Sequence, residues 1–247
     1  MPGIAVQLYT LRNEMEQDFF GVLEKVKALG YEGVEWAGFH GHDAGKVHDF
    51  FRNLGLQTAA MHISLDRVEN DYDNLLAEAR LFGATRLVVP YVDQKYHSPE
   101  GFREVRVELA KAAKRLAGDG ITLCYHHHDF ELRIDVDGVT ALEYLLAADG
   151  IEAEFDLFWL KKGGRDPFSF IQPYAGRTPL LHVKDMTGDA EQTFAEVGTG
   201  IIDFAPILKW AADNGTQWLI VEQDVCPGNA LDSIAVSIAN LRNLLGK

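Results

Sequence analysis

The chain has 247 residues, 47% of them hydrophobic and 24% charged, which is the composition of a globular protein with a sizeable core. Its 37 acidic residues outnumber 23 Lys and Arg, and the formal net charge of −14 excludes a general grip on nucleic-acid phosphates, which needs clustered cations. No apolar run approaches the ~20 residues that cross a bilayer. The negative net charge does not exclude a small anionic substrate, because a few local cations would suffice to bind it.

The N-terminus enters an apolar run at once, without a basic or signal-like segment, so we expect a cytoplasmic protein. Cys124 and Cys226 lie near apolar runs, and we interpret them as buried thiols and not as a disulfide.

Short apolar runs alternate with amphipathic segments along the whole chain. Arg86 opens a nearly continuous Leu-Val-Val run of the kind found in parallel sheets covered on both faces. The pattern predicts strands at residues 4–8, 33–36, 57–63, 86–91, 121–126, 151–156, 179–183 and 218–222.

Helix signals fall between these runs. Gly30 follows the first apolar stripe as a C-cap glycine would, and Ser98 precedes Pro99 as an N-cap precedes the first helical residue. Apolar positions within residues 75–82 line a third helix, and residues 140–148 form a short one. Asp203 is expected to cap a helix after a long connection over residues 185–203.

Strand–helix units without a linker or composition break predict an α/β fold, a (β/α)8 TIM barrel forming a single domain over residues 1–247. An open, doubly wound sheet is the alternative. Its Gly-x-Gly-x-x-Gly marker does not follow the first strand, and Gly198-Thr199-Gly200, after the seventh, lacks the third glycine.

The run over residues 180–185 places His182 and Lys184 on the same side of a buried strand, because strand side chains alternate. Buried imidazole and ammonium groups are costly unless they are paired. Other apolar runs end in groups that would pair with them. We therefore hypothesise one divalent metal held by His126, Asp156, His182 and Glu222.

Reactive groups of such a barrel stand at the carboxyl ends of its strands. An ion with open positions would bind a sugar carbonyl and stabilise the enediolate formed when the neighbouring proton leaves. Glu222 would be both ligand and proton acceptor, and Lys184 would pair with a developing oxyanion. The expected substrate-binding residues are Gln7, Glu35, His62, Tyr91 and Trp159.

Each of these residues also has a structural interpretation. His62 would then be hydrogen-bonded within the core, Asp156 would cap a turn, and Tyr91 and Trp159 would simply pack. Alternation places His126 and His128 toward the pocket and His127 away from it, if the strand continues that far.

Five segments together resemble the sugar phosphate isomerase/epimerase group of the xylose-isomerase-like barrel superfamily. The resemblance covers essentially the whole chain. It implies a TIM barrel that transfers protons on a carbohydrate or polyol and forms a homo-oligomer. It also implies a bound divalent metal, for which Mn²⁺ is expected first and Co²⁺, Zn²⁺, Mg²⁺ or Fe²⁺ are the alternatives. The segments are Tyr-His-His-His-Asp-Phe-Glu at 125–131, Phe-Asp-Leu-Phe-Trp at 155–159, His-Val-Lys-Asp at 182–185, Gly-Thr-Gly-Ile-Ile-Asp at 198–203 and Val-Glu-Gln-Asp at 221–224.

Two positions depart from the ketose 3-epimerases of that superfamily. His126 stands where they carry a glutamate that is both ligand and base, and Trp159 replaces a histidine that contacts substrate. Glu131 and the pocket-facing His128 are then the candidates for the second proton-transfer group. The histidine-rich end of the fifth strand is more similar to inosose dehydratases and keto-sugar enzymes.

Three functions follow as hypotheses. The first is a metal-dependent isomerase or epimerase acting on a small carbohydrate or polyol. The second is a lyase that dehydrates a keto-polyol or cleaves a 3-keto-glycoside on the same metal. The third is a sugar-binding barrel that has lost its chemistry.

Overall fold

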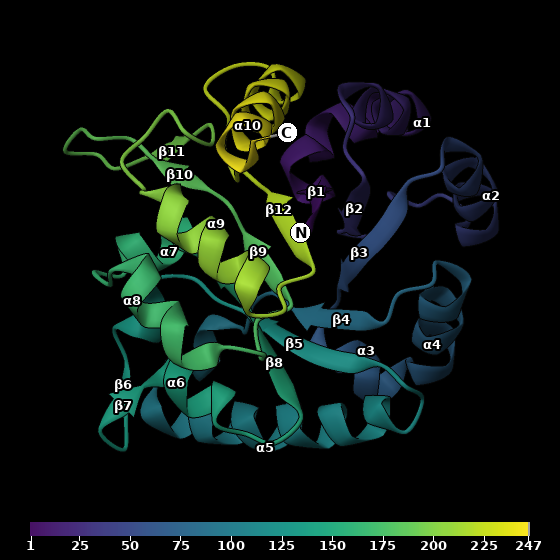
Figure 1. Cartoon of the computed structure of the whole chain (residues 1–247). Coiled ribbons are helices and arrows are strands. Elements are labelled where there is room, and N and C mark those ends of the chain that lie inside the picture. Colours follow the sequence, from purple (N-terminus) through teal and green to yellow (C-terminus); the bar gives the residue numbers. More distant parts are fainter. Residues whose placement is uncertain (247) are drawn as a thin grey trace.

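The computed structural model describes residues 1–246 and forms a closed parallel barrel surrounded by helices (Figure 1). Around the barrel the strands run β1-β12-β9-β8-β5-β4-β3-β2. Their bounds are β1 (Gly3–Gln7), β2 (Gly33–Trp36), β3 (Gln57–His62), β4 (Arg86–Val89), β5 (Thr122–His126), β8 (Ile151–Asp156), β9 (Leu180–His182) and β12 (Trp218–Val221).

Helices cover the outer face of these strands. The α-helices are α1 (Arg12–Leu29), α2 (Ala44–Leu54), α3 (Leu65–Asn70), α4 (Tyr72–Leu81), α5 (Pro99–Ala117), α6 (Ala141–Leu146), α7 (Leu157–Lys162), α8 (Pro167–Ile171), α9 (Phe204–Asp213) and α10 (Ala230–Leu245). Short 3-10 turns are η1 (Leu8–Leu11), η2 (Gln94–Tyr96), η3 (Phe130–Leu132) and η4 (Gln172–Tyr174). Two small ribbons stand in the loops, β6 (Asp135–Val136) with β7 (Val139–Thr140), and β10 (Asp185–Met186) with β11 (Phe194–Ala195).

The predicted barrel is confirmed, and so are the helix caps. Gly30 adopts a left-handed φ of 91° at the end of α1, and Ser98 Oγ accepts a hydrogen bond of 3.1 Å from Gly101 N at the start of α5. Two helices were not predicted. In α3 only Val68 is buried, so no apolar period marks it. Helix α7 begins directly after β8, because Asp156 is at once the last strand residue and the N-cap.

The barrel interior changes from apolar to charged along its axis. Alternate strand residues face outward to the helices, and the inward residues near the bottom form a separate apolar cluster of Ala5, Ala59, Ala60, Val88, Cys124, Leu180 and Ile220. Two residues further along the same strands come the side chains of Gln7, His62, His126, His182 and Glu222. TIM-barrel interiors are usually filled with branched apolar residues, so the polar side chains of this upper layer depart from ordinary barrel packing.

The long connection after β9 is ordered by one carboxylate. Asp185 accepts hydrogen bonds from the backbone N–H groups of Gly198, Gly200 and Ile202, at 3.0, 2.9 and 3.1 Å. A Cβ on Gly200 would collide with the carbonyl oxygen of Met186 and with the Asp185 carboxylate. The Gly-Thr-Gly sequence therefore serves close backbone packing around Asp185 beside the barrel mouth.

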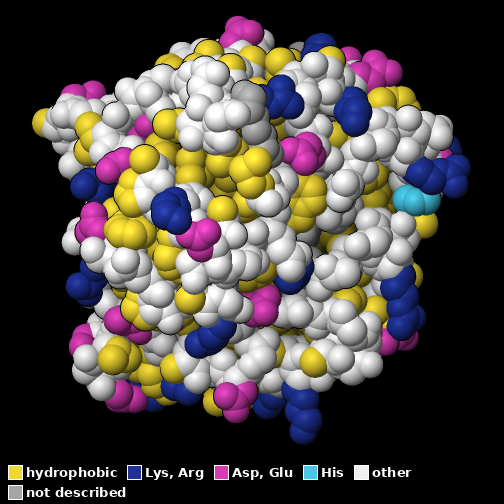
Figure 2. All heavy atoms as spheres, viewed as in Figure 1, with side chains coloured by type: hydrophobic (Ala, Val, Ile, Leu, Met, Phe, Trp, Pro, Cys, Tyr) yellow, Lys and Arg dark blue, Asp and Glu magenta, His cyan; other side chains and the backbone are white. Residues whose placement is uncertain are grey.

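The surface carries no concentrated basic patch on the face drawn in Figure 2, where Lys and Arg side chains are interspersed with Asp and Glu. Within the described residues, no helix has the length and hydropathy needed to cross a bilayer.

Candidate metal centre

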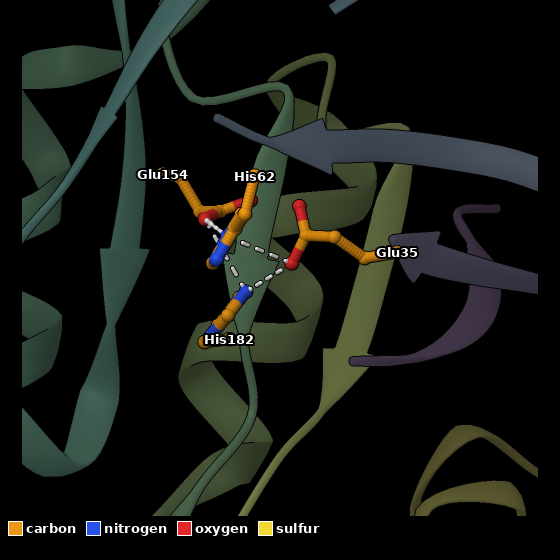
Figure 3. A group of neighbouring side chains, drawn as sticks. All are labelled: Glu35, His62, Glu154 and His182. Atoms are coloured by element: carbon orange, nitrogen blue, oxygen red, sulfur yellow. Dashed lines mark hydrogen bonds and ion pairs between the residues drawn. The ribbon is translucent and has the colours of Figure 1, made fainter. Parts of the chain in front are cut away.

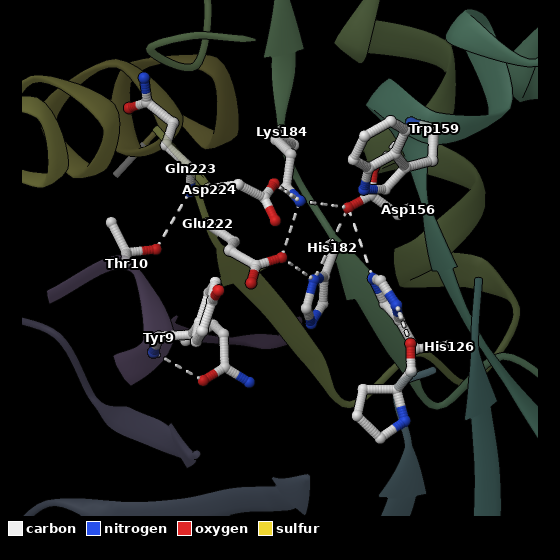
Figure 4. A network of polar contacts seen from close by, with 12 residues as sticks. Tyr9, Thr10, His126, Asp156, Trp159, His182, Lys184, Glu222, Gln223 and Asp224 are labelled. Carbon is white, nitrogen blue, oxygen red and sulfur yellow. Dashed lines mark hydrogen bonds and ion pairs between the residues drawn. The ribbon is translucent and has the colours of Figure 1, made fainter. Parts of the chain in front are cut away.

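Four side chains from the last four barrel strands converge at the carboxyl end of the barrel (Figure 4). His126 ends β5, Asp156 ends β8, His182 ends β9, and Glu222 follows β12. All four are buried, and one ligand atom from each lies within 4.8 Å of the others. The structure thus brings together the four residues that the sequence nominated as metal ligands.

The individual distances within this group suit a shared cation. His126 Nε2 lies 3.6 Å from Asp156 Oδ2, and His182 Nδ1 lies 2.9 Å from Glu222 Oε2. Among the described residues, buried His126 Nε2 has no hydrogen-bond partner. A buried nitrogen without a partner is costly, and a metal would satisfy it. Two imidazoles with two carboxylates form a donor set suited to Mn²⁺, Fe²⁺, Co²⁺ or Zn²⁺.

Lys184 supplies a fixed positive charge beside these ligands. Its side chain is fully buried, and Nζ lies 3.0 Å from Asp156 Oδ2 and 2.8 Å from Glu222 Oε2. The ammonium also donates a hydrogen bond of 2.7 Å to Asp224 Oδ2. Burial lowers the pKa of Lys184, but the three carboxylates outweigh burial and raise it well above the usual value. Lys184 is therefore charged at neutral pH.

The two carboxylate ligands are ionised. Burial raises the pKa of Asp156, but Lys184 and then His126 reverse that effect and hold it below its usual value. For Glu222, burial likewise raises the pKa, whereas Lys184 and His182 lower it well below normal. Since metals bind carboxylates in the deprotonated form, both residues are prepared for coordination at neutral pH.

His182 faces carboxylates on both sides of its ring. Nδ1 contacts Glu222, while Nε2 donates to Glu35 Oε2 at 2.7 Å. With Nδ1 directed at the centre, the Nε2–H bond to Glu35 fixes the orientation of the ring, as a carboxylate bonded to a ligating imidazole does in known metal sites. Glu154 Oε2 lies 3.3 Å from the same nitrogen.

The expected substrate-binding residues lie at different depths, some lining a cavity and others buried beneath it. A cavity of about 440 Å³ opens above the centre, and His62 and Tyr91 line it together with Tyr9, His126 and Glu222. The remaining lining residues are Ala37, Ile63, Ser64, Pro90, His128 and Asp224.

Gln7 and Glu35 are fully buried beneath that cavity. Gln7 Nε2 donates to Glu35 at 2.8 Å, and its Oε1 accepts from Tyr9 N at 3.0 Å. Their side chains are therefore enclosed by protein, and we do not carry these two forward as substrate contacts. Trp159 is not among the lining residues, and its ring lies 5.0 Å from that of His128.

The two candidates for a second proton-transfer group are placed differently. His128 lines the cavity, and burial together with His126 lowers its pKa to about 2, so its imidazole is neutral. Glu131 is fully buried and outside the lining. It accepts hydrogen bonds from Tyr125 Oη at 3.0 Å and from His128 N at 2.9 Å. Glu131 thus holds the segment that carries His128, a positioning role.

Strand β5 ends at His126, so the condition for alternation is not met at His127. His127 is nevertheless absent from the cavity lining, and its Nε2 accepts a hydrogen bond from Asp156 N at 3.1 Å. Asp156 also caps α7, because its carboxylate accepts a hydrogen bond of 2.9 Å from Trp159 N. Asp156 is therefore both a helix cap and a member of the four-residue cluster.

Sequence reasoning missed two acidic residues, buried Glu154 and partly buried Asp224. Glu154 stands two positions before Asp156 on β8, and the same alternation that selected His182 with Lys184 would have placed it on the inward face. Asp224 lies beyond β12 in a loop, where strand alternation gives no direction, so its ion pair with Lys184 had no sequence signal.

The chain resembles known proteins in sequence and in its barrel fold. The family model described as Xylose isomerase-like TIM barrel matches residues 23–244. Inosose dehydratase of Clostridium beijerinckii is 27% identical over 159 residues, which cover 57% of this chain and 53% of that enzyme. The chain thus spans about half the length of this relative. Inosose dehydratase of Lacticaseibacillus casei is 23% identical over 257 residues, covering 87% of this chain and 85% of the enzyme.

Among solved structures, a sugar phosphate isomerase/epimerase from Parabacteroides distasonis superposes with a TM-score of 0.83. The two chains are 20% identical, and the superposition covers 98% of each. At this identity the likeness establishes the shared barrel fold.

Proposed function

The chain belongs to the xylose isomerase-like TIM barrel family, an enzyme family, and from this premise we propose that it is a divalent-metal-dependent isomerase or epimerase acting on a small sugar or polyol. The observation that carries the proposal is the convergence of His126, Asp156, His182 and Glu222 below an open cavity. The carbohydrate enzymes among its relatives support the substrate class.

When bound, a divalent ion supplies a Lewis acid that polarises a carbonyl and stabilises the charge of an enediolate. The chain's own residues move the proton. Glu222 makes its contacts to His182 and Lys184 through Oε2 and lines the cavity, where its carboxylate accepts the proton next to the carbonyl. Lys184 keeps that carboxylate ionised and balances the charge left on the substrate.

His128 supplies a second acceptor on the same cavity. Its imidazole is neutral, and buried Nδ1 has no hydrogen-bond partner among the residues that the structure describes. Glu222 follows β12 and His128 follows β5, so the two groups approach a substrate from separate strands. A group that has taken up the substrate proton becomes the acid that returns a proton at another position.

A dehydratase is the second candidate. Elimination of water begins with the same proton removal and then departs from isomerisation when the β-hydroxyl leaves. The alignment with the Lacticaseibacillus casei inosose dehydratase, which spans 87% of this chain, favours it specifically.

Proton NMR in D₂O with a panel of keto-sugars and keto-inositols tests the proposal. The metal-loaded protein is expected to exchange the proton next to the carbonyl for deuterium and to form an isomer or epimer. Loss of water from the product would identify the dehydratase instead. No exchange and no product with any panel member would contradict both.

Variants of Glu222 and His128, with a control variant remote from the cavity, test the proposed proton-transfer roles. Glu222→Gln and His128→Gln should each reduce exchange by about 10²-fold or more, the usual contribution of a general base. His48→Gln, in helix α2 and remote from the cavity, should leave the rate unchanged. Equal rates in all three variants would refute the assigned roles.

A further inference from the structure

A second group of metal-ligating side chains lies directly beneath the first. Glu35 on β2, His62 on β3, Glu154 on β8 and His182 on β9 point toward one another inside the barrel (Figure 3). One ligand atom from each lies within 4.8 Å of the others. We call this set the lower cluster. Of this set, the proposed proton-transfer chemistry uses only His182, as a ligand of the upper centre.

The spacing in the lower cluster is close to that of a tetrahedral metal site. His182 Nε2 lies 2.7 Å from Glu35 Oε2 and 3.3 Å from Glu154 Oε2. His62 Nε2 lies 3.2 Å and 2.9 Å from the same two oxygens. Metal–ligand bonds of about 2.0–2.2 Å place neighbouring tetrahedral ligands about 3.3–3.6 Å apart. An outward shift of a few tenths of an ångström would admit an ion.

Within residues 1–246, the cluster balances its carboxylates with imidazoles alone. Among the described residues, Glu35 and Glu154 form ion pairs with His62 and His182, and no Lys or Arg joins them. The centre above has Lys184, whereas the lower cluster has only imidazoles against two carboxylates that are fully buried.

The carboxylates retain free coordination capacity. Glu35 Oε1 and Glu154 Oε1 are buried and have no hydrogen-bond partner in the described part of the chain. Buried carboxylate oxygens without partners are costly, and a divalent ion would compensate both. An entry path exists because His62 lines the cavity above.

We propose that Glu35, His62, Glu154 and His182 form a second divalent-metal site, so that the barrel mouth takes two ions that share the ring of His182. Nδ1 of that ring faces the upper ion and Nε2 the lower one. Coordination through Nε2 requires His62 and His182 to give up any proton on that atom to solvent as the ion enters, and a His182 ring that binds both ions carries no ring proton.

Titration of the metal-stripped full chain with Zn²⁺ by calorimetry tests this site, which goes beyond the proposed function. The wild-type protein should bind two ions in the barrel. His62→Gln and the isosteric Glu154→Gln should each lose one equivalent and keep the upper ion, because both retain His182. His126→Gln should lose the upper ion instead. His42→Gln, on the surface, serves as the control and should match wild type.

The outcomes separate the two claims. Wild-type saturation at one equivalent, or an unchanged stoichiometry in both His62→Gln and Glu154→Gln, would overturn the second site. If His126→Gln alone then loses an ion, the upper centre survives. Should a variant fail to fold by circular dichroism, the wild-type stoichiometry decides.

Discussion

Replacing Glu131 with Gln tests how the segment after β5 is held. Burial raises the pKa of the Glu131 carboxyl from 4.5 to about 8, against the hydrogen bonds from His128 N and Tyr125 that lower it. The folded protein therefore keeps a proton on this group between those two pH values, whereas the unfolded chain has lost it. Because the folded state binds more protons, its free energy of unfolding falls as the pH rises through that window.

The size of the effect follows from the same values. At about 1.36 kcal/mol per pH unit, the window from 4.5 to about 8 corresponds to a loss of about 5 kcal/mol in the wild type. Glu131→Gln has nearly the same shape and no charge, so it lacks this loss. The two proteins should have similar stability near pH 4.5, and the variant should be more stable at pH 8.

Urea unfolding of both proteins from pH 4 to pH 9 measures this difference, and other titrating groups cancel in the comparison. A difference that stays constant with pH would refute the assigned environment of Glu131. Activity is the second readout. Glu131→Gln should keep most of the proton exchange if the residue positions His128, and a loss as large as that of His128→Gln would make Glu131 a catalytic group.

Three further predictions concern the metal centre and its supporting loop. Lys184→Met should lower the free energy of unfolding in urea with EDTA by about 3–5 kcal/mol, because it leaves buried carboxylates without their cation. Added Mn²⁺ should restore part of this loss, and an unchanged unfolding midpoint in the variant would contradict the charge argument. Gly200→Ala should lose about 1–3 kcal/mol in thermal unfolding, because its methyl group meets the Met186 carbonyl oxygen. Gly228→Ala, with no atom within 4 Å of the new methyl, is the matched control, and equal losses would refute the clash. Chelation should lower the unfolding free energy by about 2.7 kcal/mol relative to protein in metal at 100 times Kd, and no change would count against a bound ion.

The barrel was predictable because its strands are short, continuous apolar runs with a helical stripe after each. The same alternation placed His126 toward the centre. The pattern could not show how deep along the barrel axis each side chain lies. Gln7 ends β1 as Asp156 ends β8, and Glu35 is the last residue but one of β2, yet Gln7 and Glu35 lie under the cavity and are fully enclosed.

Features outside regular periodicity were also out of reach. Helix α3 buries a single side chain, and the ribbons β6–β7 and β10–β11 have two residues per strand, too few for alternation to show. Asp224 reaches Lys184 from a loop. Pairings of this kind depend on how loops fold back over the barrel mouth, and residue order alone carries no such information.

Anomalous diffraction from crystals grown with Mn²⁺ tests the central claim most directly. We expect a peak within about 2.0–2.2 Å of His126 Nε2, His182 Nδ1 and a carboxylate oxygen of both Asp156 and Glu222. A fully metallated crystal without a peak among these four side chains would contradict the assignment of a metal centre and the chemistry that rests on it.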